Sequence, residues 1–412
     1  MSEDTNLGSM PLLASEGEIK HFDQGVHMLQ LWVNVCIIET DEGVVLFDVG
    51  LLFNGPRIVE EVRAITDKPV RYVIYGHGHA DHAFGVKAVI EDAKERGHPP
   101  PVIIAHENIP KRFDRYQEML PYHEHINRIQ FDIPDEMPAY VRKYIYPNLT
   151  YQEAMSFRLG KTTFELRHAK GETDDATWMW IPERKTACVS DLWVWSCPNI
   201  GNPFKVQRYE VEWAQGLEEI AARSPELLLP GHGSALRGAD EIRDACHTVA
   251  RALRYLHEQV VTMLNQGKWQ EEILQGFEWP DEFTKSPYLA PIYGHPYFIV
   301  QAILRRYHGW FDGNASHLFP SPSREIAGEV MGLIGNPEKV IERARALEKE
   351  GQTQLALHIV DFVIESGAEK KNEALELKAQ LLKSLAEREK SLIARNIFLG
   401  GVRQIKKTLR KQ

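Results

Sequence analysis

Six consecutive residues, His77-Gly78-His79-Ala80-Asp81-His82, constrain this chain more than any other stretch. They place three imidazoles and a carboxylate directly after the apolar run Tyr72-Val73-Ile74-Tyr75. A strand that ends in a turn directs several side chains to one place, and neutral imidazole and carboxylate are ligands of Zn²⁺ and related ions. The pattern therefore predicts a β-strand whose end binds metal. The alternative is a solvated polar turn, which a lone His-x-His pair would favour.

Three later segments repeat this arrangement. The segment from His168 to Asp175 follows a run of alternating apolar residues, Asp191 follows a second apolar run, and His232 follows Leu227-Leu228-Leu229. Open α/β sheets carry their chemistry at the ends of buried strands. We therefore expect these polar residues to complete one site.

The order of these motifs resembles the metallo-β-lactamase superfamily over about residues 20–240. The resemblance implies an α/β fold, an αββα sandwich, in which the early Asp48 of Phe47-Asp48-Val49-Gly50 supports the site structurally. It also implies two metal ions with Asp191 bridging them. One ion would take His77, His79 and Glu172, and the other would take Asp81, His82 and His232.

The third ligand departs from the common pattern of the superfamily. Most members have a histidine in a Gly-His-Thr turn, whereas this chain reads Gly171-Glu172-Thr173. The resemblance assigns Glu172 to that position, and the alkylsulfatase branch also uses acidic residues there. The alternative is that Glu172 is a surface turn residue and that His168 binds the metal. Asp174 and Asp175 suit turn roles or roles behind the ligands.

The remaining periodicity predicts helices around the sheet and throughout the C-terminal part. Helical spacing covers 56–66, 84–97, 239–267 and 296–307, followed by 323–334, 337–350, 352–366, 369–385 and 388–411. Residues 106–150 are expected to form an irregular, substrate-covering insertion in which His123 and His125 are exposed. Residues 1–20 are polar and are expected to lie on the surface. Together with the resemblance, this periodicity leads us to expect an αββα sandwich followed by an all-α helical domain.

Three further segments extend the resemblance to the zinc alkylsulfatases, the metallo-β-lactamase-type (class III) sulfatases. They are Asn265-Gln266-Gly267, Gly309-Trp310-Phe311-Asp312-Gly313-Asn314, and the stretch Arg395-Asn396-Ile397-Phe398-Leu399-Gly400-Gly401. The resemblance implies a catalytic domain at 1–240, a helical extension and substrate-pocket linker at 241–322, and a dimerisation domain at 323–412. It therefore implies a homodimer.

This chain also differs from that family at two points. Compared with that family, we expect a short form without the C-terminal lipid-carrier-like domain and the N-terminal extension, which argues against long-chain detergents as substrates. The family's Ser-His-Asn element is replaced by Tyr297-Phe298-Ile299, with His295 just upstream. This replacement is the main argument against a sulfate ester.

The resemblance predicts a dinuclear hydrolase that cleaves a small-molecule sulfate ester or related ester with a metal-bound hydroxide. The ions would be Zn²⁺, with Mn²⁺ or Fe²⁺ as alternatives because several ligands are anionic. Asp81, Asp191 and Arg208 are the candidate catalytic residues. Arg208 would bind an anionic group, or else it forms a surface salt bridge to Glu210 or Glu212.

Several alternatives remain open. A lactone, a phosphodiester or another ester would use the same metals, and a di-iron redox protein or a non-catalytic scaffold represents a different class. Tyr288, Tyr293 and Tyr297 are equal candidates for a proton donor. Core packing or a hydrophobic substrate wall would explain four tryptophans, namely Trp178, Trp180, Trp193 and Trp195.

Composition limits the other classes of function. The formal net charge of −10 gives no basic surplus for nucleic acid. Cys36 and Cys188 lie in apolar runs, and the wide spacing of the four cysteines does not indicate a disulfide framework. No apolar run approaches the roughly 20 residues of a membrane span, and the acidic N-terminus has no signal core, so a cytoplasmic location is expected.

Overall fold

The computed structural model describes residues 17–137 and 143–411, so most of the prediction for residues 1–20 lies outside the described residues. The chain forms two compact units. The first spans residues 1–123 and 140–307, and the second spans residues 124–139 and 308–412. The domain limits expected from the sequence, 1–240, 241–322 and 323–412, stay a prediction.

The first unit contains a seven-stranded sheet and a six-stranded sheet. The first sheet follows chain order: β1 (Glu18–His21), β2 (Val26–Gln30), β3 (Val35–Glu39), β4 (Val44–Phe47), β5 (Val70–Ile74), β6 (Val102–His106) and β7 (Leu149–Tyr151). The second has the order β13 (Leu236–Arg237), β12 (Leu227–Pro230), β11 (Thr186–Ser190), β10 (Ala176–Ile181), β9 (Thr162–Ala169) and β8 (Ala154–Leu159). Strands β4 to β7 are parallel, and so are β11 and β12, which brings their carboxyl ends together at one edge of each sheet.

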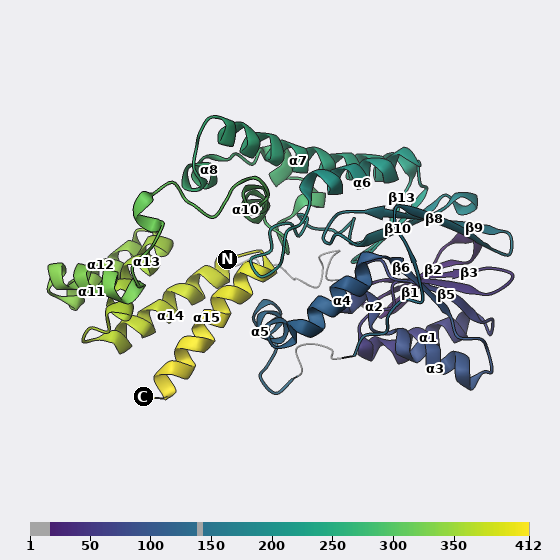
Figure 1. The fold of residues 1–412 in the computed structure, drawn as a ribbon, viewed down its shortest axis with the longest axis horizontal. Helices are drawn as coiled ribbons and strands as arrows, with labels where there is room; N and C mark the ends of the chain where they lie inside the picture. The colour runs from purple at the N-terminus through teal and green to yellow at the C-terminus, as the bar shows by residue number, and fades with distance from the viewer. Residues whose placement is uncertain (1–16, 138–142, 412) are drawn as a thin grey trace. The chain divides into compact units, whose positions relative to one another are not determined.

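Helices cover the outer faces of both sheets (Figure 1). Helices α1 (Gly55–Ile65) and α3 (Val86–Glu95) lie on the first sheet, and α6 (Glu210–Ala222) and α7 (Ala239–Asn265) lie on the second. Between the sheets, residues such as Phe47, Phe164 and Leu229 form a third apolar layer. This αββα sandwich confirms the predicted fold. Trp178, Trp180 and Trp193 are buried in it, and Trp195 packs against the same cluster, as core packing requires.

The prediction that residues 106–150 are irregular was wrong. Helices α4 (Asn108–Glu118) and α5 (Leu120–Gln130) occupy the first part of the segment. Helix α4 buries Ile109, Phe113 and Tyr116 at helical spacing, but Arg112 interrupts this face, so its apolar period is weak in the sequence. His123 is buried against Tyr116 with ring centroids 4.4 Å apart, contrary to the expected exposure, whereas His125 is exposed.

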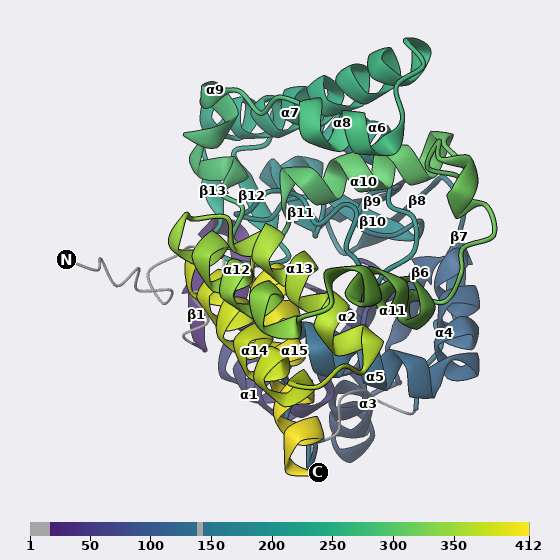
Figure 2. The same cartoon turned by 90° about the vertical axis from the view of Figure 1, so that its left-hand side faces the viewer.

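The first unit ends in short helices after α7, namely α8 (Gln270–Gly276), α9 (Asp281–Thr284) and α10 (Pro296–Tyr307). The second unit contains α11 (Ser323–Ile334), α12 (Pro337–Lys349), α13 (Thr353–Ser366), α14 (Lys371–Arg388) and α15 (Leu392–Arg410). Their limits agree with the predicted helices to within a few residues. Figure 2 shows α14 and α15 side by side, and they share an apolar core with α12 and α13.

The second unit also holds part of the insertion. Asn396 of α15 donates a hydrogen bond of 2.8 Å to the Gln130 carbonyl.

All four cysteines are buried in the first unit and form no disulfide. Within 17–137 and 143–411, no helix combines the length and the apolar character that a bilayer crossing needs.

Candidate functional site: a metal centre between the sheet edges

Five chain segments bring the predicted ligands to one place in the first unit. His77 and His79 follow β5, and the short helix α2 (Ala80–Ala83) carries Asp81 and His82. The other three ligands lie in the β9–β10 turn, after β11 and after β12; they are Glu172, Asp191 and His232. Each segment leaves a strand at the same edge of the sandwich, which explains why residues 155 positions apart can meet.

Short distances link these side chains in a continuous cluster. His77 Nε2 lies 2.8 Å from His79 Nδ1, which is 3.8 Å from Glu172 Oε1. Asp191 is central, because its carboxylate oxygens lie 3.8 Å from His77 Nε2, 3.5 Å from His82 Nε2 and 3.3 Å from His232 Nε2. Asp81 Oδ2 lies 3.9 Å from His82 Nε2 and 4.0 Å from His232 Nε2.

Two groups of three side chains within this cluster bring their ligand atoms close enough together to hold a metal ion. One is His77, His82 and Asp191, and the other is Asp81, His82 and His232, each with ligand atoms within 4.8 Å of one another. His82 belongs to both groups. The predicted division of the ligands between two ions therefore stays a prediction, whereas the convergence of the residues is observed.

The cluster fits a bound cation because two of its buried polar atoms make no hydrogen bond to protein. His82 Nε2 and Asp191 Oδ1 are both buried, face each other across 3.5 Å, and make no hydrogen bond. Buried polar atoms without partners are costly and therefore rare. A divalent ion would satisfy both, and histidine nitrogen with carboxylate oxygen is a donor set that suits Zn²⁺ and Mn²⁺.

Burial shapes the protonation of the ligands. It lowers the pKa of His77 and of His79 well below the usual value, and neighbouring positive charge adds to the effect, so both rings are neutral donors. Burial also raises the pKa of Glu172 to about 7, against the opposing influence of Arg208. Burial alone would raise the pKa of Asp191, but His232 and His82 hold it well below the ordinary range.

Asp48 supports the cluster from behind, as the sequence predicted. Its carboxylate accepts hydrogen bonds from the Gly76 amide (2.6 Å) and the Ser190 hydroxyl (2.9 Å), and lies 2.8 Å from His82 Nδ1. The Trp32 carbonyl similarly accepts from Nδ1 of His232. These contacts fix which ring nitrogen of each histidine faces the centre.

Glu172, rather than His168, faces the cluster. The His168 ring stacks on His106 with centroids 3.8 Å apart, and its Nδ1 lies 3.0 Å from the Ala176 carbonyl. Glu172 is buried beside His79 and accepts hydrogen bonds from Asn199 Nδ2 (2.8 Å) and from Arg208 Nη1 (2.6 Å). The geometry therefore favours Glu172 as the third ligand.

Arg208 does not form the surface salt bridge that was the alternative. It is buried at 2% exposure, and its Nη1 also donates to the Asn199 carbonyl. The acidic pair Glu210 and Glu212 instead contacts Arg306 of α10. The sequence identified Arg208, but its partner lies 36 residues upstream and could not be read without the fold.

The replaced family element lies on α10, where Ile299 is buried in the core. The ring of His295 packs on Phe298, and its Nδ1 accepts from the Tyr297 amide at 3.1 Å. None of the three candidate tyrosines is selected as a proton donor by these contacts.

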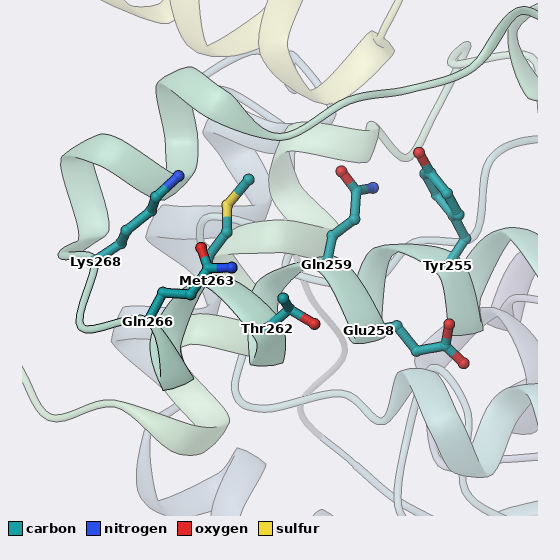
Figure 3. Close-up of a pocket in the computed structure, with 7 residues that line it drawn as sticks. All are labelled: Tyr255, Glu258, Gln259, Thr262, Met263, Gln266 and Lys268. Atoms are coloured by element: carbon teal, nitrogen blue, oxygen red, sulfur yellow. The ribbon is translucent and has the colours of Figure 1, made fainter.

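A pocket of about 290 Å³ lies along the exposed face of α7 (Figure 3). Its side chains recur at helical spacing and end at the turn after the helix; they are Tyr255, Glu258, Gln259, Thr262, Met263, Gln266 and Lys268. No candidate ligand lines this pocket, so we assign it no role in the metal site.

Two family matches cover most of the chain. Residues 33–232 match the metallo-beta-lactamase superfamily, and residues 270–408 match the alkyl sulfatase dimerisation family. The chain thus carries a metallo-β-lactamase superfamily domain, and this domain holds the candidate metal cluster. An alkylsulfatase-type dimerisation domain follows it, and this combination resembles the alkylsulfatases.

Individual relatives agree with this assignment. A linear primary-alkylsulfatase of a Pseudomonas species is 23% identical over 389 residues, covering 90% of this chain and 73% of the relative. The alkyl/aryl-sulfatase BDS1 of Saccharomyces cerevisiae is 22% identical, covering 92% of this chain but 62% of its own length. The structure of the inverting sec-alkylsulfatase Pisa1 from Pseudomonas sp. has a TM-score of 0.82 at 20% identity, covering 94% of this chain and 66% of that chain, and it establishes the shared fold.

Proposed function

We propose that this protein is a dinuclear metal-dependent hydrolase that cleaves a small-molecule sulfate ester. The observation that carries the proposal is the pair of buried, unsatisfied ligand atoms, His82 Nε2 and Asp191 Oδ1, at the centre of seven convergent ligands. Similarity to alkylsulfatases over about nine-tenths of the chain supports the sulfate ester. Zn²⁺ is the proposed metal, with Mn²⁺ and Fe²⁺ as alternatives.

Bound divalent ions would supply Lewis acidity and lower the pKa of a water molecule toward neutrality. The chain's own residues hold the ligands in place. Asp48 and the Trp32 carbonyl orient His82 and His232, and Arg208 with Asn199 orients Glu172. Arg208 places positive charge near His79, which favours an anionic ester over a neutral one, whereas burial lowers the pKa of Lys205 to about 7. Arg208 remains the proposed anion binder, acting from beside Glu172.

A hydrolysis panel tests the substrate. Short alkyl and aryl sulfates, a phosphodiester, a lactone and a carboxylic ester would be offered to the purified protein, with product release measured for each. We expect sulfate release. Activity only on another ester would retain the hydrolase and overturn the sulfate assignment, while oxygen or nitric oxide reduction would favour the di-iron alternative.

Matched variants test the residues. Asp81→Ala and His232→Ala are expected to reduce turnover by about three orders of magnitude or more while the fold is retained. Asp67→Ala removes an exposed carboxylate of the same unit, which forms an ion pair with Arg96, and is expected to leave turnover unchanged. Full activity in either site variant would overturn the assignment.

We also propose that the protein is a homodimer that associates through the second unit. The match to a dimerisation family supports this, and α11 exposes Ile326 at 47%, Ile334 at 42% and Leu333 at 89%. Leu333→Asp is expected to give monomers in sedimentation velocity. Phe53→Asp alters an apolar residue of the first unit that is also strongly exposed (75%), and it should leave the dimer intact. The expected cytoplasmic location is a separate proposal, tested by cell fractionation.

A further inference from the structure

Two ligand-bearing turns approach each other beside the metal cluster. One holds His77, Gly78 and His79, and the other holds Glu172 and Thr173. They are joined by the Thr177 amide, which donates to the Gly76 carbonyl at 2.6 Å. This backbone contact joins the segments at Gly76 and Thr177. Nearer to Gly78 and Thr173, side-chain contacts hold the two turns together.

Asp175 connects both turns with a single carboxylate. The Thr173 hydroxyl donates to its Oδ1, and the Gly78 amide approaches the same oxygen at 3.4 Å. The side chain is fully buried. Although burial pushes its pKa upward, Arg112 and the Thr173 hydroxyl hold the pKa of Asp175 below its ordinary value, so the group is a carboxylate.

Arg112 of α4 holds that carboxylate in place. Its Nε donates to Asp175 Oδ2, and its Nη2 donates to Asp174 Oδ1. The Arg112 side chain is 4% exposed and packs on the metal-binding turn, because a Cβ at Gly78 would lie 2.7 Å from its Cδ and 3.1 Å from Asp175 Oδ2. Burying the Arg112–Asp175 pair costs desolvation energy that an apolar pair at these positions would not cost. The pair therefore has a role in fixing the geometry of the metal-binding turn rather than in stability alone.

We infer that Arg112 and Asp175 are positioning residues that clamp the His77–His79 turn to the Glu172 turn and so set the affinity of the ion those three ligands bind. Neither residue touches the cluster centre, and Arg112 acts through Asp175. This inference rests on the proposed metal site and extends it to a helix that the sequence pattern did not reveal.

Zn²⁺ titration of chelator-treated protein, with an indicator competing for the metal, tests the clamp. Asp175→Asn removes the charge that binds Arg112, and Thr173→Val removes one hydroxyl without creating a buried charge. Both variants are expected to bind one of the two ions about 10–100-fold more weakly, as loss of partners behind metal ligands does elsewhere, while the other ion binds as in the parent.

A half-buried ion pair in the same unit provides the control. Arg63 and Asp92 join α1 to α3 at 2.6 Å with side chains 10% and 12% exposed, and they contact no candidate ligand. Asp92→Asn should lower the midpoint of thermal unfolding without changing either metal affinity. If Asp175→Asn does not fold, Thr173→Val decides the question.

The outcomes separate the two claims. Parent-like binding of both ions in the folded Asp175 or Thr173 variant would overturn the clamp while leaving the proposed function standing. Equal weakening in Asp92→Asn would also overturn it, because a general loss of stability would then explain the result. A parent protein that binds no metal would overturn the proposed function and the clamp with it.

Discussion

Glycine has opposite roles at the metal-bearing sheet edge and in the C-terminal helices. A Cβ on Gly76 would meet the Ser190 hydroxyl and lie 2.6 Å from Asp48 Oδ1, and one on Gly231 would meet Asp191 Oδ1. In α11, by contrast, a Cβ on Gly328 or Gly332 would meet no atom within 4 Å. The sheet edge therefore has no space for a methyl group on Gly76 or Gly231, whereas α11 has space for one on Gly328 or Gly332.

The backbone is also constrained beside the candidate ligands. Asp48 (φ 60°) and Ser190 (φ 46°) are non-glycine residues in the left-handed region, and both support the ligands. Strain of this kind persists where the surroundings impose it, typically at functional sites. In the second unit, Gly335 and Gly367 end α11 and α13 with positive φ, which costs glycine little, but Asp132 and Lys370 of that unit are also non-glycine residues with positive φ. What distinguishes Asp48 and Ser190 is therefore their contact with the candidate ligands.

Of the variants that compare the two regions, Gly76→Ala is expected to have the largest effect on turnover. The added methyl group has no space between Ser190 and Asp48, so the metal-binding turn must move. We expect a loss of about 1–3 kcal/mol in the free energy of unfolding and a fall in turnover of about 100-fold or more, since small displacements of reacting groups have effects of this size. Thermal unfolding and the hydrolysis assay measure the two quantities. Unchanged turnover would show that the edge is less constrained than the contacts indicate.

A core truncation in the second unit should separate stability from chemistry. Leu381 of α14 is fully buried, and Leu381→Ala is expected to cost about 2–5 kcal/mol of unfolding free energy. The metal content of the remaining folded protein should equal that of the parent, because no candidate ligand lies in this unit. Chemical denaturation and elemental analysis provide the measurements. Loss of metal from the folded variant would remove the contrast between the two regions.

The smallest effect is expected from Gly328→Ala. The residue lies exposed in the interior of α11, where alanine is a better helix former by about 0.5–1 kcal/mol. We expect a small rise in stability in denaturant unfolding, with turnover unchanged. Destabilisation would mean that this face of α11 is covered by something that the single chain does not contain.

Periodicity predicted an α/β core and the helical C-terminal part, because apolar runs are local patterns. The sandwich and the full set of seven ligands followed from the resemblance to the metallo-β-lactamase superfamily. The sequence did not predict α4, because Arg112 interrupts the buried face of that helix. It also did not reveal that Arg112 pairs with Asp175, 63 residues away, or that His123 packs on Tyr116. Such contacts depend on how separate elements pack, and no periodicity within either element records them.

Elemental analysis of the purified protein tests the central claim most directly. The seven convergent ligands and the unsatisfied His82 and Asp191 atoms predict two divalent ions per chain. A chelator should remove these ions and abolish sulfate-ester hydrolysis, and added Zn²⁺ should restore both the metal content and the activity. Less than one ion per chain, with no turnover of any ester after metal is supplied, would contradict the account.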